Sequence, residues 1–167
     1  LVFGLAHGDG ASTLIDGEAK MYEQARIVSV NSHKEVRWLR VRKSDFTSAM
    51  QTFTTAVQSA GLPLPQMIDS EKREDSYAFL ITAPTETLGA IAGLKNADFN
   101  MDLRELSSVS ATCQGTFASP LPDQIAQTLA RRSISIHKML FSAMTISVFV
   151  DAKDRDPALQ LIHDLAK

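Results

Sequence analysis

The side chains that could do chemistry are few and lie far apart in this 167-residue sequence. The four histidines, His7, His33, His137 and His163, include no pair with the spacing of metal ligands, and no cysteine or carboxylate cluster accompanies them. Cys113 is the single cysteine and has no obvious histidine partner, so an inert thiol is favoured. Nucleophile, base and oxyanion donors do not come together. We therefore expect no catalytic site and no metal site in these residues.

Other simple signals argue against further classes of function. The segment HGDG at 7–10 lacks the Lys-Ser/Thr continuation of a phosphate-binding loop, and we interpret it as a turn. The net charge of −2 gives no reason to expect nucleic acid or an acidic membrane surface as a partner. No apolar run approaches the roughly 20 residues that cross a bilayer. A lone cysteine forms no internal disulfide, which fits a reducing cytoplasm.

The elements that must position any site follow from hydrophobic periodicity. Short strands are predicted at 27–30 and 36–41, separated by the turn residues Asn31 and Ser32. Ser44 is expected to cap a helix, and Gly61 to end it in the left-handed conformation. The elements that follow are an extended, edge-like strand at 62–68, a charged loop at 69–75, a strand at 77–81 and a helix that begins near Pro84.

The second part of the sequence repeats this order. Strand, helix, strand, strand, helix occurs twice with a period of roughly 70 residues, and Glu35 corresponds to Glu105. Each unit is a split βαβ, which places both helices on one face of an antiparallel sheet. We predict an α+β fold of two tandem ferredoxin-like βαββαβ modules whose sheets pair edge to edge. The second set comprises a strand at 105–113, a loop at 114–120, a helix at 121–132, strands at 133–140 and 144–150, and a helix capped by Asp156 and opened by Pro157.

The same residues that argue against catalysis are compatible with binding of a small molecule. In a split βαβ module the loop after the first strand leads into a helix N-terminus, whose free backbone N–H groups attract a carboxylate. That loop is Arg42–Asp45 in the first module and Gln114–Pro120 in the second. Such a loop beside the edge strand of a partner module makes a crevice for a small molecule. An amino acid could place its carboxylate on the N–H groups and its ammonium on a nearby Asp or Ser.

The second module also carries a more specific signal. The segment VSATCQGTFASPLPDQIAQTLARRSISIHKMLFSAMTISVFVDAKDRDPALQLIHDL, at 109–165, resembles the C-terminal ACT domain of aspartokinases, which reads G-I-N-I-x-M-I-S-T-S-E-I-K-I-S-V and closes with A-x-x-x-L-H. GASTLI, at 10–15, resembles the G-T-x-I segment where the kinase region passes into its regulatory tail, and 27–100 resembles the preceding ACT domain more distantly. The positions that fit the second ACT pattern are Ile134, Ile136, Met139, Ser142, Ile146, Ser147, Val148, Ala158, Leu161 or Ile162, and His163.

The resemblance implies an amino-acid-sensing region that controls the phosphorylation of aspartate by ATP to 4-phosphoaspartate, the first step towards lysine, threonine and methionine. Residues 1–26 would be a linker from an upstream kinase domain, 27–100 the first ACT domain and 101–167 the second. ATP and Mg would belong to that kinase domain or catalytic subunit, and this chain would hold no cofactor. In such cytoplasmic enzymes ACT domains pair by their edges across a homodimer, and lysine or threonine binds between them.

Several positions depart from the family pattern. The first-module loop has no Gly or Pro, and Ala143 and Thr145 stand where the family has Glu and Lys. Because each polar partner lost from a buried site weakens binding by ~1–3 kcal/mol, two or three losses would erase micromolar inhibition. We expect an altered, weakened or absent response to lysine. The effector-binding residues implied by the resemblance are Arg42, Lys43, Ser44, Asp45, Asp69, Ser70, Gln114, Gly115, Thr116 and Ser142.

Three alternatives remain open at this point. The modules could serve only as a dimerisation device, through apolar edges at 134–139 and 146–150. They could also form a free-standing regulator with no kinase attached. An RNA-binding ferredoxin-like module would need exposed aromatic residues on central strands and a basic sheet face. Trp38, Tyr77 and Phe79 come from one module only and the charge is acidic, which disfavours RNA.

Overall fold

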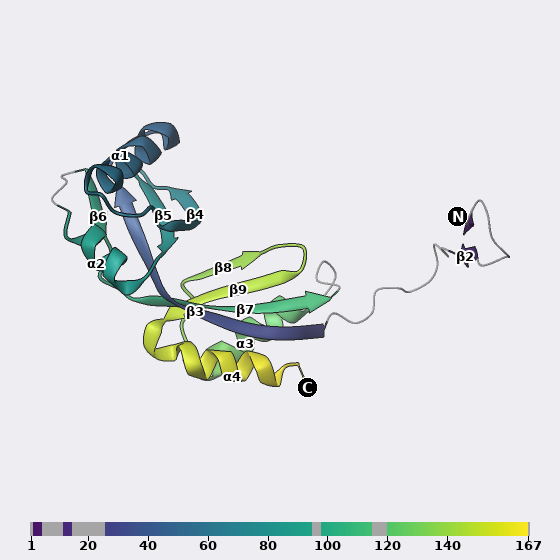
Figure 1. The fold of residues 1–167 in the computed structure, drawn as a ribbon. Coiled ribbons are helices and arrows are strands. Elements are labelled where there is room, and N and C mark those ends of the chain that lie inside the picture. Colours follow the sequence, from purple (N-terminus) through teal and green to yellow (C-terminus); the bar gives the residue numbers. More distant parts are fainter. Residues whose placement is uncertain (1, 5–11, 15–25, 95–97, 115–119, 167) are drawn as a thin grey trace.

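The computed structural model describes residues 2–4, 12–14, 26–94, 98–114 and 120–166 of the chain. Two short strands, β1 (Val2–Gly4) and β2 (Ser12–Leu14), pair antiparallel with each other. The other described strands form one seven-stranded antiparallel sheet in the order β4-β5-β3-β7-β9-β8, with β6 paired to β3 (Figure 1). The strands are β3 (Arg26–Val41), β4 (Gln66–Lys72), β5 (Tyr77–Thr82), β6 (Phe99–Met101), β7 (Leu106–Gln114), β8 (Lys138–Phe141) and β9 (Thr145–Asp151).

The helices divide the sheet into two halves. The first two helices cover one face of β4, β5, β6 and the end of β3, and the last two cover one face of β7, β8, β9 and the start of β3 (Figure 1). We call these units the first half and the second half. The predicted α+β class, with helices on one face of antiparallel strands, is confirmed. The helices are α1 (Phe46–Ser59), α2 (Thr85–Ala92), α3 (Leu121–Arg131) and α4 (Arg155–Asp164), with a 3-10 turn, η2 (Ala152–Asp154), before α4.

Strand β3 joins the two halves. It runs for 16 residues without the turn predicted at Asn31 and Ser32, and that prediction is wrong. Its first part pairs with β7 and its last part, from Val36, pairs with β5. Register shifts near each end of the β7 pairing absorb the irregular residues as bulges, so the strand bends instead of breaking. Glu35 lies in the second bulge with a φ of 69°, the left-handed region that few side chains adopt.

This strand replaces the edge-to-edge pairing of two sheets that the sequence predicted. The halves belong to one sheet because β3 gives backbone hydrogen bonds to both. The predicted units 27–100 and 101–167 therefore share a strand, and the boundary between them stays a prediction. The bulge at 33–36, called the joint below, is where β3 passes from one half to the other.

Within the described residues, buried apolar side chains form three clusters, which explains how the halves stay together. One cluster fills the space between helices and strands in each half. Alternation along the strands sends other apolar side chains to the opposite, helix-free face, where the two halves meet in a third cluster. We call it the junction core. Its buried members are Val36, Leu80, Leu106 and Phe149, and Trp38, Ile68 and Leu140 pack against them.

Two strand predictions need correction. The segment 69–75 was predicted to be a loop, but its residues up to Lys72 belong to strand β4. They stay extended because β4 remains paired with β5, and the last pair is Lys72 with Tyr77. The strand predicted at 133–140 begins only at Lys138 and ends at Phe141. Ser133 and Ile134 instead form the C-terminal cap of α3. Their N–H groups donate to carbonyls of that helix, and Ser133 has a φ of 59°.

Helix ends differ from prediction by one or two residues. The N-cap of α1 is Asp45 and not Ser44, because the Asp45 carboxylate reaches the N–H of Ser48. Helix α4 begins at Arg155, before the predicted opening residue Pro157, since η2 leads directly into it. Among the described residues, no helix is long and apolar enough to cross a membrane.

Gly61 ends the first helix region as predicted, with a φ of 68° and its N–H donating to the carbonyl of Gln58 at 2.9 Å. A Cβ at this position would meet no atom within 4 Å, so only backbone strain opposes a side chain. We expect Gly61→Ala to lower the free energy of unfolding by about 1 kcal/mol in denaturant titrations. Gly89→Ala, inside α2, is the control and should raise it by roughly 0.5–1 kcal/mol. A lower stability for both variants would contradict this account.

Candidate functional site

The first predicted loop, 42–45, leads from β3 into α1 and is held by contacts within the chain. The N–H of Arg42 donates to the carbonyl of Asp98 at 2.6 Å, and the Lys43 ammonium lies 3.1 Å from the Asp98 carboxylate. The Asp45 carboxylate accepts from the N–H of Ser48 at 2.8 Å. The predicted acidic contact for an effector ammonium is thus already occupied in capping α1.

This cap makes the start of α1 sensitive to acid. The N–H of Ser48 holds the pKa of Asp45 below its ordinary value, and the Ser48 hydroxyl adds to the effect. Because the folded-state pKa is depressed, the cap stabilises the protein above the ordinary aspartate pKa, about 3.9, and its contribution is lost as pH falls through the folded value. We expect the Ser48 amide resonance to titrate with a midpoint below about 3.9.

The control is Asp45→Asn, which keeps a capping oxygen but has no ionisable group. Its Ser48 amide should show no such titration. A midpoint at or above the ordinary aspartate value in the unchanged chain would show that the cap does not form in solution.

The other predicted effector residues lie in separate places. Asp69 and Ser70 are in β4, Ser142 is in the turn between β8 and β9, and Gln114 ends β7, where its side chain accepts from Arg26 at 3.3 Å. Gly115 and Thr116 lie outside the described residues. A single chain does not gather the described members into one pocket, and their role in effector binding stays a prediction.

Asp69 instead takes part in a contact between the two halves that the sequence did not predict. The Lys138 ammonium, from β8, lies 2.7 Å from Asp69 and 3.5 Å from Glu71, both in β4. It also lies 5.8 Å from the centre of the Trp38 ring, which belongs to the junction core. The Asp69 carboxylate raises the pKa of Lys138, against the opposing effect of burial, and Glu71 adds to the rise. We call the contact of Lys138 with Asp69 and Glu71 the latch. It connects β4 and β8, the two outermost strands of the sheet, on the helix-free side.

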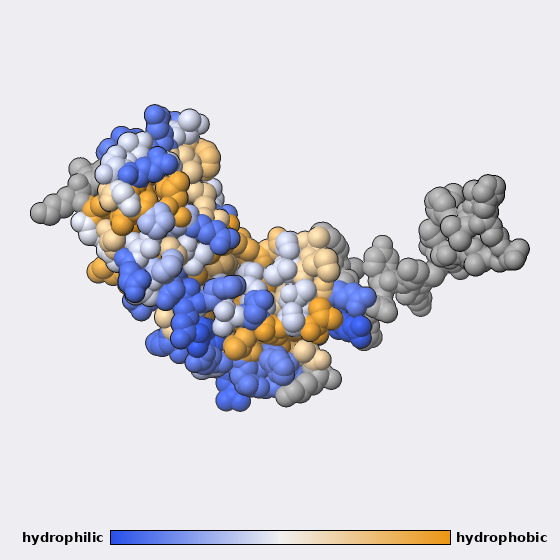
Figure 2. All heavy atoms as spheres, in the orientation of Figure 1, coloured by the Kyte–Doolittle hydropathy of each residue, from blue (hydrophilic) through white to orange (hydrophobic). Residues whose placement is uncertain are grey.

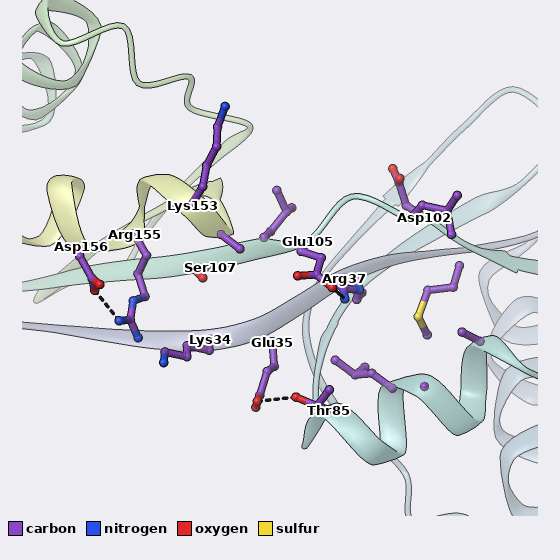
Figure 3. A pocket seen from close by; sticks show the side chains of 17 residues that line it. Lys34, Glu35, Arg37, Thr85, Asp102, Glu105, Ser107, Lys153, Arg155 and Asp156 are labelled. Atoms are coloured by element: carbon purple, nitrogen blue, oxygen red, sulfur yellow. Dashed lines mark hydrogen bonds and ion pairs between the residues drawn. The ribbon is translucent and has the colours of Figure 1, made fainter.

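A cavity of about 780 Å³ opens on the helix-bearing side of the joint (Figure 3). Its apolar surface includes the buried side chains of Leu88 and Met101. Charged residues dominate the rest, and Figure 2 shows hydrophilic residues gathered where the start of α4 faces the first half. We call this the joint cavity. Its polar and charged lining residues are Lys34, Glu35, Arg37, Thr85, Asp102, Glu105, Ser107, Lys153, Arg155 and Asp156.

The repeat in the sequence gives one signal for this cavity. Glu35 and Glu105, which correspond in the two modules, both line it. Glu35 accepts from the Thr85 hydroxyl of its own unit at 2.6 Å, whereas Glu105 pairs with Arg37 of the other unit. Periodicity places the two glutamates at equivalent positions, but it does not show that β3 brings those positions together.

Two further candidate side chains, those of His137 and Cys113, are held by contacts within the protein. His137 lies between Asp151, 3.0 Å from its Nε2, and Arg104, 3.2 Å from its Nδ1. Burial raises the pKa of the Cys113 thiol, which keeps it protonated at neutral pH. Among the residues that the structure describes, no group of three or more His, Cys, Asp or Glu side chains could hold a metal ion.

Comparison with known proteins bears on this arrangement. No protein-family model matches the sequence, and no curated protein matches it. Solved structures do match: a structure of aspartokinase alpha and beta subunits superposes with a TM-score of 0.60 at 20% identity, over 83% of this chain and 97% of that one. The regulatory subunit of aspartate kinase from Thermus thermophilus gives 0.61 at 16% identity, over 85% of this chain and 99% of that one.

The chain has the fold of an aspartokinase regulatory region. The resemblance identified in the sequence is thereby confirmed at the level of the fold. Aspartate kinase from Clostridium acetobutylicum also matches, with a TM-score of 0.62 at 11% identity over 92% of this chain. This chain covers 38% of the length of that enzyme.

Proposed function

We propose that this chain is an amino-acid-sensing regulatory region, with ACT-type modules, that controls an aspartokinase. One observation supports the proposal most: the fold spans 97% and 99% of two chains, one of them described as a regulatory subunit of aspartate kinase. The match covers 83% and 85% of this chain, more than either half alone contains. The kinase chemistry, with its ATP and Mg, would belong to a kinase domain or catalytic subunit that acts with this chain.

The proposed effector is lysine or threonine, bound between ACT modules of two copies of the chain. The loop at 42–45 is the best-placed contact, because it leads into the N-terminus of α1, where N–H groups attract a carboxylate. The cap formed by Asp45 competes with that carboxylate for the N–H of Ser48. We therefore propose a weakened response, in which the effector must displace a charge-assisted contact within the protein.

The proposed homodimer forms through the free edge of the sheet at β8. This strand is last in the sheet order, and the exposed side chains of Phe141 and Met144 lie at its end and in the turn that follows. The second predicted edge, 146–150, is in β9 between β7 and β8, so that part of the dimerisation hypothesis is wrong. Assembly without sensing remains the second candidate function, favoured by the internal contacts of Lys43 and Asp45.

Calorimetric titration of the chain with L-lysine, L-threonine and L-methionine tests the proposal. We expect saturable heat with lysine or threonine, at an affinity weaker than micromolar, and a dimer by light scattering. A dimer that gives no saturable heat with any of the three amino acids would contradict sensing and would support the second candidate function, assembly alone. A monomer with no saturable heat would contradict both functions.

A further inference from the structure

Two hollows meet at the joint of β3. The joint cavity lies on one side, and a second hollow of about 790 Å³ lies beside the free edge of β3, between it and the start of α2. Lys34, Glu35 and Arg155 line both. Each hollow falls within the roughly 300–1,000 Å³ typical of small-molecule sites. The joint is therefore an open, charged space that neither the effector loops nor the dimer edge uses.

The charged side chains around the joint cavity differ in whether they have a partner within the protein. Every carboxylate that lines it has a partner, whereas the ammonium groups of Lys34 and Lys153 have no hydrogen bond or ion pair with any described residue. The lining carries four cationic and four carboxylate side chains, so its charges balance, but the two unpaired ammonium groups are available to an anionic group of a ligand. The carboxylate contacts are Glu35 with the Thr85 hydroxyl, Glu105 with Arg37, Asp156 with Arg155, and Asp102 with the N–H of Arg104.

Ser107 supplies a neutral polar group deeper in the same space. Its side chain is on the helix-bearing face of β7, lines the cavity and is only 1% exposed. No hydrogen bond joins its hydroxyl to another described residue. Because this hydroxyl faces the cavity, it is available to donate a hydrogen bond to a ligand oxygen there.

We propose that the joint cavity binds a small metabolite through an oxyanion group, a carboxylate or a phosphate monoester. Lys34 and Arg155 reach from β3 and α4 towards the same end of the cavity, with Ser107 behind them, whereas Lys153 points away (Figure 3). Lys34 gives a point charge, and Arg155 keeps guanidinium N–H groups beyond its contact with Asp156. This site lies within one chain, is separate from the effector loops and goes beyond the proposed function.

Titration of the whole chain with succinate and with inorganic phosphate, followed by calorimetry and by amide resonances, tests the charge contacts. We expect saturable binding of at least one probe, and which probe binds identifies the preferred oxyanion. Lys34→Met should weaken that binding at least about tenfold, as loss of a direct charged contact does. Lys72→Met, an equal charge change on the exposed end of β4, should leave it unchanged. Ser107→Ala should weaken it without loss of folding.

Steric occlusion gives an independent test. Gly89 lines the cavity from α2, and a Cβ there would meet no atom within 4 Å, so Gly89→Phe should fill the space and abolish binding. Ala90→Phe, its exposed neighbour outside the cavity, is the matched control, and melting curves should show both variants folded. The proposal is overturned by no saturable binding of either probe, by undiminished binding to Gly89→Phe, or by equal losses in Lys34→Met and Lys72→Met.

Discussion

Replacing Phe149 with alanine is expected to lower the free energy of unfolding by about 3–5 kcal/mol. Phe149 is 1% exposed and is the largest buried member of the junction core. Its removal leaves a cavity between the helix-free faces of both halves, which β3 and the segment 102–105 connect along the chain. We therefore also expect the two halves to lose cooperativity, so that urea unfolding broadens or separates into two transitions.

Phe141→Ala is the matched control. Phe141 belongs to the neighbouring strand β8 but is 62% exposed, so its truncation should change stability by no more than about 0.5 kcal/mol. Equal losses for the two variants would contradict the claim that the junction core holds the halves together.

Replacing Lys138 with methionine is expected to lower the free energy of unfolding by about 1–2 kcal/mol at neutral pH. The change keeps the apolar stem over Trp38 but leaves Asp69 and Glu71 without the cation they share. The estimate is well below that for a fully buried ion pair, because these side chains are 25–29% exposed. The loss should be largest at low salt, where the two carboxylates repel most strongly.

The latch also predicts a dependence on alkaline pH. The folded-state pKa of Lys138 is raised, so its stabilising contribution is complete below the ordinary lysine pKa of about 10.4 and is lost as pH rises through the folded value. We expect denaturant titrations to show that loss in the unchanged chain and not in Lys138→Met. Identical alkaline profiles for the two proteins would contradict the latch.

The sequence predicted the elements of the fold better than their connections. Alternation of apolar residues located β5, β7 and β9, and helical spacing located all four described helices, because each pattern reflects a local periodicity. The continuous strand β3 was missed because Asn31 and Ser32 are typical turn residues, yet pairing with β7 keeps them extended. Glu35 in the left-handed region was not predictable either, since its conformation is set by the bulge and by Thr85 from another element.

The candidate sites were harder to predict than the fold, because they depend on contacts between residues that are distant in the sequence. Sequence reasoning placed the first loop correctly at the start of α1, since a capping residue and a helix pattern are adjacent in the chain. It did not foresee that Lys138 contacts Asp69 across the sheet, because β4 and β8 lie at opposite ends of the strand order. The joint cavity depends on the bend of β3 and on three helix and strand ends that are distant in sequence, so no local motif marks it.

The proposed regulatory role is tested most directly by joining this chain to an aspartate kinase catalytic region and measuring aspartate-dependent ATP consumption. We expect millimolar lysine or threonine to lower the rate of the joined protein, while the catalytic region alone does not respond. We expect millimolar rather than micromolar effector to be needed, because the Asp45 carboxylate already accepts the N–H of Ser48. The same rate with and without both amino acids, in a joined protein that binds aspartate and ATP normally, would contradict the role proposed for this chain.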